Sequence, residues 1–131
     1  MNLTTTLMAL LLIPTLCWSI NRYLFSHKLS NVSVSAISAG VLYICILISV
    51  MYIENKYDTE LASFDLNNDG VFSGIEVTPE QEKAMHNVIS DTGRNFAPFT
   101  GAIFSLMYFF VTWALFTLIA WLHKQYAIKN T

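Results

Sequence analysis

The sequence predicts an all-α membrane protein with three transmembrane helices and one extracytoplasmic insert between the second and third. Three observations favour this fold class. Hydrophobic residues make up 54% of the chain and charged residues only 12%, about half the usual share for soluble domains. Three stretches, 1–21, 29–53 and 95–122, contain no Asp, Glu, Lys or Arg, and each reaches the roughly 20 residues that a helix needs to cross a bilayer. All nine acidic residues lie between Glu54 and Asp91.

The first expected span covers residues 3–20. Pro14 has no backbone N–H, so it leaves the carbonyl of Leu10 without its helical partner. Membrane helices tolerate such a proline when a neighbouring group satisfies the carbonyl. The segment has no positively charged start, and no small-x-small cleavage site follows its apolar run, so we interpret it as a retained span and not as a secretory signal peptide.

The second expected span covers residues 32–53 and is rich in small residues. Ser35/Ala39 and Ala36/Gly40 each have small-xxx-small spacing. This spacing allows another helix to approach closely, and such packing drives helix association in lipid. The approaching helix can belong to the same chain or to another protein, and the sequence leaves both open.

The third expected span covers residues 97–122, and we expect Pro98 to open it. The span is rich in Phe, Tyr and Trp, which is more typical of packing or lipid-facing bulk than of a cofactor site. After it comes a tail that carries Lys124 and Lys129.

The distribution of Lys and Arg predicts the orientation. Arg22 and Lys28 lie in the connection after the first span, and Lys124 and Lys129 lie in the tail. The positive-inside rule places both segments on the cytoplasmic side of a plasma or inner membrane. The N-terminus and the insert are then outside. The predicted organisation is residues 1–53 for two spans, 54–96 for an extracytoplasmic module, and 97–131 for the third span and a cytoplasmic tail.

The insert contains the twelve residues Asp-Leu-Asn-Asn-Asp-Gly-Val-Phe-Ser-Gly-Ile-Glu, at positions 65–76. This segment resembles the calcium-binding loop of the EF-hand family at every defining position, and Phe72 departs mildly from the usual aliphatic residue. The resemblance implies that Gly70 makes the sharp turn and that oxygen atoms bind Ca²⁺. The implied ligands are Asp65, Asn67, Asp69, the carbonyl of Val71, Ser73 and Glu76.

The flanks of the loop fit two helices. Residues 54–64 continue the second span as an incoming helix. Thr78, Pro79 and Gln81 have the chemistry of a helix N-terminus, so an outgoing helix is expected from there to about Ser90, with Gly93 near its end. This restart separates the outgoing helix from the loop.

Several function classes are disfavoured. The chain has no basic stripe for nucleic acid. The spans hold no Asp, Glu, Lys or Arg that would mark a proton or ion path. No nucleophile and base cluster together, so no enzymatic activity is expected. His27, His86 and His123 have no neighbours that complete a soft-metal set, and we interpret them as ordinary surface or interface residues.

Three hypotheses for function follow. The first is an accessory or regulatory subunit of a larger membrane complex, with a calcium-stabilised external module. The second is a membrane-resident immunity protein against an envelope-acting toxin, which is an analogy of architecture. The third is a calcium-gated homo-oligomeric channel, which the lack of polar span faces disfavours. The expected partners are the lipid bilayer and another membrane or envelope protein, or a second copy of the chain.

Overall fold

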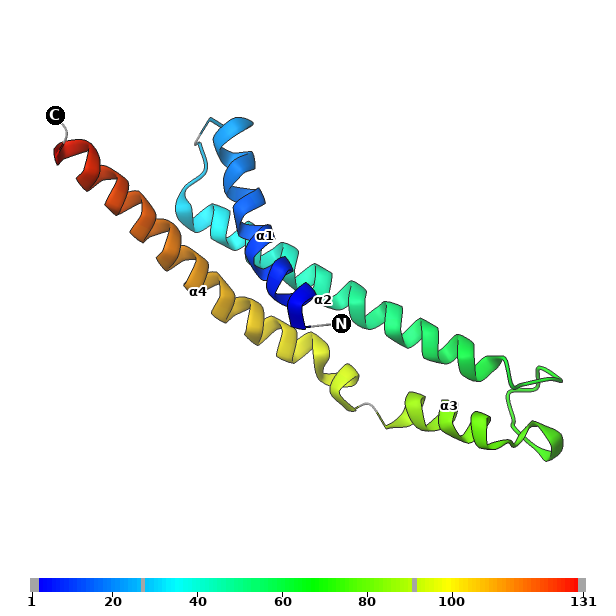
Figure 1. Cartoon of the computed structure of the whole chain (residues 1–131). Coiled ribbons are helices and arrows are strands. Elements are labelled where there is room, and N and C mark those ends of the chain that lie inside the picture. The colour runs from blue at the N-terminus through cyan, green and yellow to red at the C-terminus, as the bar shows by residue number, and fades with distance from the viewer. Residues whose placement is uncertain (1–2, 27, 91, 130–131) are drawn as a thin grey trace. The chain divides into compact units, whose positions relative to one another are not determined.

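The computed structural model describes residues 3–26, 28–90 and 92–129, and within these ranges the fold is all-α, without strands. Figure 1 shows α1 (Leu3–Tyr23), α2 (Asn31–Ala62), the 3₁₀ helix η1 (Gly74–Glu76), α3 (Pro79–Ile89) and α4 (Thr92–Lys129). The predicted fold class is confirmed at this level. The chain forms two compact units: the first contains α1, α2 up to Ile44 and α4 from Gly101, and the second contains Cys45–Thr100.

Two segments are long and apolar enough to cross a membrane by length and composition. They are α2 and the segment Pro79–Lys129, which contains α4. Only 28% and 11% of their apolar windows are buried in the fold. A helix in the core of a soluble protein buries most of its apolar side chains, so these segments differ from such helices. The 21-residue α1 covers the predicted first span.

Hydrogen bonds connect the three helices of the first unit. The Tyr108 hydroxyl on α4 donates to the carbonyl of Leu10 on α1 at 2.7 Å. This is the carbonyl that Pro14 leaves without its helical partner, and a neighbouring helix supplies the hydrogen bond instead. The side-chain amide of Asn31, at the start of α2, lies 3.5 Å from the carbonyl of Phe116 on α4.

The two small-residue pairs of α2 have different environments. Ser35 and Ala39 are buried within the first unit, whereas Ala36 and Gly40 are exposed. A Cβ atom added at Gly40 would meet nothing within 4 Å. The pair Ser35/Ala39 therefore serves the packing of the chain itself, and the pair Ala36/Gly40 is available to another molecule.

The structure corrects the expected roles of Pro98 and Gly93. The helix α4 begins at Thr92, so Pro98 lies inside it and does not open it. A proline within a helix removes one backbone hydrogen bond, which long membrane helices tolerate. Gly93 does not end the outgoing helix, because α3 ends at Ile89, where the N–H of Ser90 donates to the carbonyl of His86 at 2.9 Å.

Candidate metal centre

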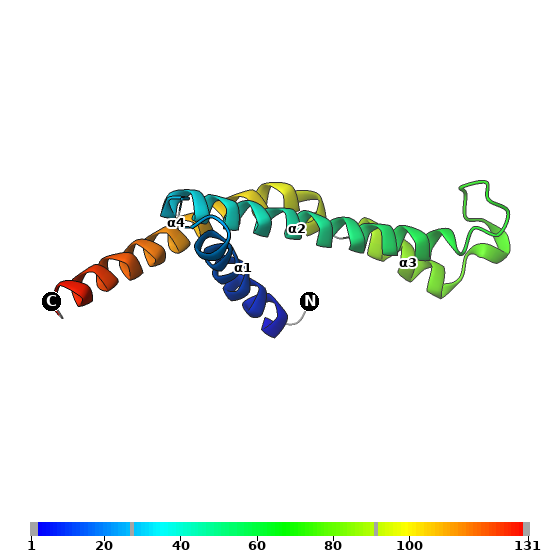
Figure 2. The same ribbon diagram turned by 90° about the horizontal axis from the view of Figure 1, so that it is seen from above.

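The incoming helix carries the chain directly to the first predicted ligand. After α2 ends at Ala62, the N–H groups of Phe64 and Asp65 donate to the carbonyls of Leu61 and Ala62 at 3.1 and 3.2 Å. These turns extend the helix end to Asp65. The first position of the loop is thus attached directly to the end of α2. Figure 2 shows the loop as the irregular segment between α2 and α3.

Gly70 makes the turn that the loop resemblance requires. Its φ is +76°, in the left-handed region that favours glycine, and Asn68 has a φ of +58°. A Cβ atom at Gly70 would meet nothing within 4 Å. Glycine is therefore favoured at this position by its backbone conformation, and not by a lack of space for a side chain.

The side chains of the first half of the loop fold over its own backbone. The carboxylate of Asp65 accepts the N–H of Asp69 at 3.2 Å and the N–H of Gly70 at 2.9 Å. The amide oxygen of Asn67 accepts the same Asp69 N–H at 2.9 Å, and its amide nitrogen donates to the Asp69 carboxylate at 2.9 Å. Asp69 also accepts the N–H of Val71 at 2.7 Å. These bonds bring Asp65, Asn67 and Asp69 into one network.

Glu76 links the two ends of the loop. Its side chain is only 5% exposed. Oε1 accepts the N–H groups of Leu66 and Asn67 at 2.9 and 3.3 Å, and Oε2 accepts the N–H of Ser73 at 3.1 Å. Three N–H donors offset the cost of burying this carboxylate. The last predicted ligand is therefore held beside the start of the loop by the fold itself.

The Asp and Glu side chains among the predicted ligands do not form a metal-binding cluster. Within the described part of the chain, no three His, Cys, Asp or Glu side chains form a group that could hold a metal ion. The carboxylates of the loop face backbone N–H groups instead, while Val71 and Ser73 are exposed in its second half.

The donor set nevertheless fits a hard cation. A carboxylate offers about four acceptor positions, and the bonds above use two on Asp65 and three on Glu76. Both side chains thus keep at least one unused lone pair that could bind a cation. All six predicted ligand atoms are oxygens, as calcium prefers.

The outgoing helix starts as its sequence predicts. Pro79 is the first residue of α3, and the Thr78 hydroxyl accepts the N–H of Gln81 at 3.2 Å. The short helix η1 forms the last part of the loop, so only Val77 and Thr78 separate the loop from α3. The predicted break at Thr78-Pro79 is confirmed, and it separates the Glu76 end of the loop from α3.

Arg94 has a role in the second unit that the charge pattern does not predict. Its guanidinium donates to the carbonyls of Asn87 and Val88, at 2.7 and 3.1 Å, and lies 4.9 Å from the ring centre of Tyr57. One side chain on α4 thus contacts both the end of α3 and α2. Its only signal in the sequence is a basic residue close to an acidic segment, which does not specify these contacts.

Among the described residues, His86 and His123 belong to no metal-binding group of His, Cys, Asp or Glu side chains. Nδ1 of His86 lies 3.2 Å from the hydroxyl of Ser90 on the same helical turn. His27 lies outside the described residues.

Comparison of the chain with protein-family models, with curated proteins and with solved structures found no match. The interpretation of residues 65–76 therefore depends on their donor pattern and their hydrogen bonds.

Proposed function

We propose that the chain is a calcium-binding integral membrane protein that acts as an accessory or regulatory subunit of a larger membrane complex. The observation that carries the proposal is the loop at 65–76. It combines oxygen donors at all six ligand positions with a backbone already folded around the first and last carboxylates. Calcium would be held by Asp65, Asn67, Asp69, Val71, Ser73 and Glu76.

The role proposed for calcium is structural. The second unit carries nine acidic and three basic side chains, a net charge of −6. A bound Ca²⁺ would offset two of these charges and would join the Asp65 and Glu76 ends of the loop. The carboxylates of the loop are engaged by backbone N–H groups, so the proposal gives them a binding role and no catalytic one.

The proposed topology has three crossings, with the N-terminus and the loop outside and the C-terminus in the cytoplasm. Two helices with the length and composition of membrane spans support it, as do the many large apolar side chains that α1, α2 and α4 expose. So many exposed large apolar side chains support contact with lipid or with another protein. The Lys and Arg residues of the connection and the tail support the orientation.

The accessory role is supported by a free groove in the first unit. This groove has a volume of about 330 Å³, and its lining includes Ala36, Ala39, Gly40, Ala102, Leu106 and Phe109. The small residues in this lining allow the backbone of another helix to come close, which favours association in lipid. We therefore propose that a membrane helix of the partner binds here.

Calorimetry on the full-length protein in detergent tests the calcium site. We expect Ca²⁺ to bind with a Kd of about 10⁻⁴–10⁻³ M, the range of extracellular modules, and more tightly than Mg²⁺. Glu76→Gln removes one ligand charge and should abolish most binding. Asp69→Asn removes a second ligand charge. Because Asp69 is exposed, this variant should stay folded, so a loss of calcium binding in it would not result from unfolding.

Glu80→Gln is the matched control for these variants. Glu80 is an exposed carboxylate in the first turn of α3, outside the loop. This variant changes the net charge equally and should keep its affinity. Equal affinities in the wild type, Glu76→Gln and Asp69→Asn would refute the ligand assignment.

Purification in mild detergent with calcium present tests the accessory role. A stoichiometric complex with other membrane proteins is the expected result. Recovery of a secreted toxin would indicate an immunity protein instead, and a pure homo-oligomer would indicate the channel.

A further inference from the structure

We infer that the first unit binds the phosphate headgroup of an anionic phospholipid between Arg22 and Lys124. This inference adds a second site to the proposed function, and it rests on the membrane placement proposed above. The site lies where α1 ends, where α2 begins and along the last part of α4. In the proposed topology, this is the cytoplasmic surface of the membrane.

The site is a cavity with two permanent cations from different helices. Its volume is about 370 Å³, and its lining includes Trp18, Arg22, Asn31, Phe116, His123 and Lys124. Arg22 comes from the last turn of α1, and Lys124 comes from α4. Two cations that face one cavity can together bind a phosphate group, and the planar guanidinium can do so through two parallel hydrogen bonds.

Several contacts hold this cavity in shape. The Arg22 guanidinium lies 5.5 Å from the ring centre of Trp18, within the range of a cation–π interaction. Asn21 is 4% exposed, and its side chain both donates to the carbonyl and accepts the N–H of Leu29, each at 3.1 Å. This pair fixes the connection from α1 to α2. The Asn31 bond to Phe116 then joins the start of α2 to α4.

The cations of the first unit have no anionic side chain in their own unit. Residues 1–53 and 92–131 contain no Asp or Glu, while Arg22, Lys28, Lys124 and Lys129 give the first unit a charge of +4. A negative ligand therefore meets no acidic side chain of that unit. Basic pockets between membrane helices on the cytoplasmic side are suited to anionic lipid headgroups.

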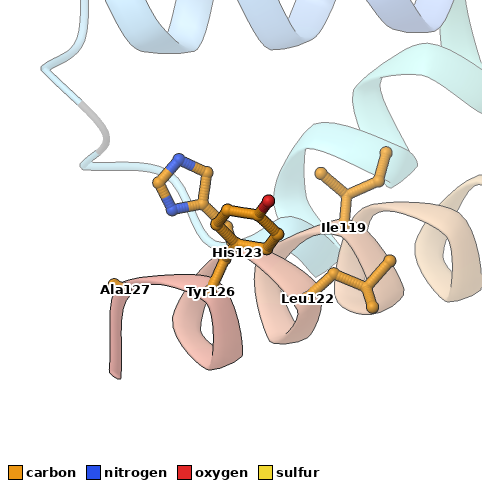
Figure 3. A pocket seen from close by; sticks show the side chains of 5 residues that line it. All are labelled: Ile119, Leu122, His123, Tyr126 and Ala127. Carbon is orange, nitrogen blue, oxygen red and sulfur yellow. The ribbon is translucent and has the colours of Figure 1, made fainter. Parts of the chain in front are cut away.

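An adjoining apolar surface favours a lipid over free phosphate. Figure 3 shows Ile119, Leu122, His123, Tyr126 and Ala127 together on the last turns of α4. They line a hollow of about 450 Å³, and Ile119 and His123 also line the cation cavity. A phospholipid can place its phosphate by the cations and its glycerol and upper acyl carbons against this apolar strip. Inorganic phosphate has no apolar part that could contact this strip.

Native mass spectrometry tests the inference on the full-length protein in detergent, offered equimolar phosphatidylglycerol and phosphatidylcholine. We expect the anionic lipid to be retained preferentially. Each cation near an anionic lipid contributes roughly a fivefold change in affinity, so the double variant Arg22→Gln/Lys124→Gln should lose about 25-fold. Lys129→Gln, which removes one charge from α4 outside the cavity, should lose clearly less affinity than either single variant, Arg22→Gln or Lys124→Gln, each of which should lose about fivefold.

Three results would overturn the inference. One is equal retention of the two lipids, and another is equal retention of phosphatidylglycerol by the wild type and a folded double variant. The third is displacement of the lipid by excess inorganic phosphate, which would assign the cavity to a soluble anion. The double variant should keep its calcium affinity and Glu76→Gln should keep its lipid, so a failure at one site is distinguishable from a failure at the other.

Discussion

The two units of the molecule differ most clearly in charge. The first unit carries +4 and no acidic residue, and the second carries −6. Their polar contacts differ in one respect: hydroxyl groups donate to helix carbonyls in both units, as Thr59 does to Asn55 at 2.6 Å in the second, but Asp and Glu side chains occur only in the second. In the first unit, hydroxyl groups such as those of Ser38 and Thr112 donate to carbonyls of their own helix, at 2.8 and 2.9 Å. In the second, carboxylates accept backbone N–H groups across a loop.

The proposed topology places most of the first unit in lipid and the loop of the second unit in water. A helix in lipid has to satisfy its polar groups internally, because no water replaces them. A loop in water can expose charged side chains. A loop that binds a cation needs negatively charged ones. The two proposed ligands follow the same division: a cation for the acidic unit and an anionic headgroup for the basic one. The predictions below test whether the division holds.

The largest expected effect is a difference in thiol labelling between the two sides of the membrane, where a cysteine either reacts or does not. With Cys17 and Cys45 replaced by Ser, a cysteine at Asn87 in the second unit should react with an impermeant thiol reagent in intact cells. A cysteine at Asn130, which lies outside the described residues, should react only after the cells are lysed. The reverse pattern would place the acidic unit in the cytoplasm and would contradict the orientation of both proposed sites.

The second prediction separates internal packing from partner binding on α2. Ala39→Leu inserts a large side chain at a position that is 8% exposed, and it should destabilise the first unit by about 1–3 kcal/mol. Gly40→Leu points into open space, so it should leave stability nearly unchanged but should reduce co-purification of the partner. Thermal unfolding in detergent gives the first readout and pull-down yield the second. If Gly40→Leu keeps the partner fully, the groove is not the docking site.

The comparison also shows how far the sequence predicts the structure. Local chemistry predicts the all-α class, the Thr78-Pro79 start of α3, the turn at Gly70 and the carbonyl freed by Pro14. The start of α4 is missed because proline is read as a helix opener, although a long helix can hold Pro98 internally. The contact of Arg94 with Tyr57 and the cavity between Arg22 and Lys124 are missed because they join residues far apart in the chain. No local pattern encodes such pairs.

The third prediction concerns where calcium acts. A ligand that binds only the folded form stabilises it by about 1.4 kcal/mol at tenfold saturation. Hydrogen exchange with and without calcium should therefore show higher protection within residues 54–96, up to about tenfold, and little change in α1 or in α4 beyond Gly101. Large changes within the first unit would show that calcium acts on the helices of the membrane region. They would favour the channel hypothesis.

The smallest expected effect belongs to the hydrogen bond between Tyr108 and Leu10. Tyr108→Phe removes the donor, and interhelical hydrogen bonds in membrane proteins contribute about 0.6 kcal/mol on average. Tyr126→Phe removes the same atom from a residue that is 74% exposed on the same helix, so it is the matched control. Its effect on thermal stability in detergent should be near zero.

A double-mutant cycle with Pro14 shows whether the bond exists because of the proline. Pro14→Ala restores a backbone N–H that can donate to the Leu10 carbonyl within α1, so this carbonyl no longer depends on Tyr108. Tyr108→Phe should then cost less in the Pro14→Ala background than in the wild type, with a coupling of about 0.6 kcal/mol. Additive effects would mean that the tyrosine stabilises the first unit by packing alone. In that case, the Leu10 carbonyl would not be an example of a helix polar group that the first unit has to satisfy internally.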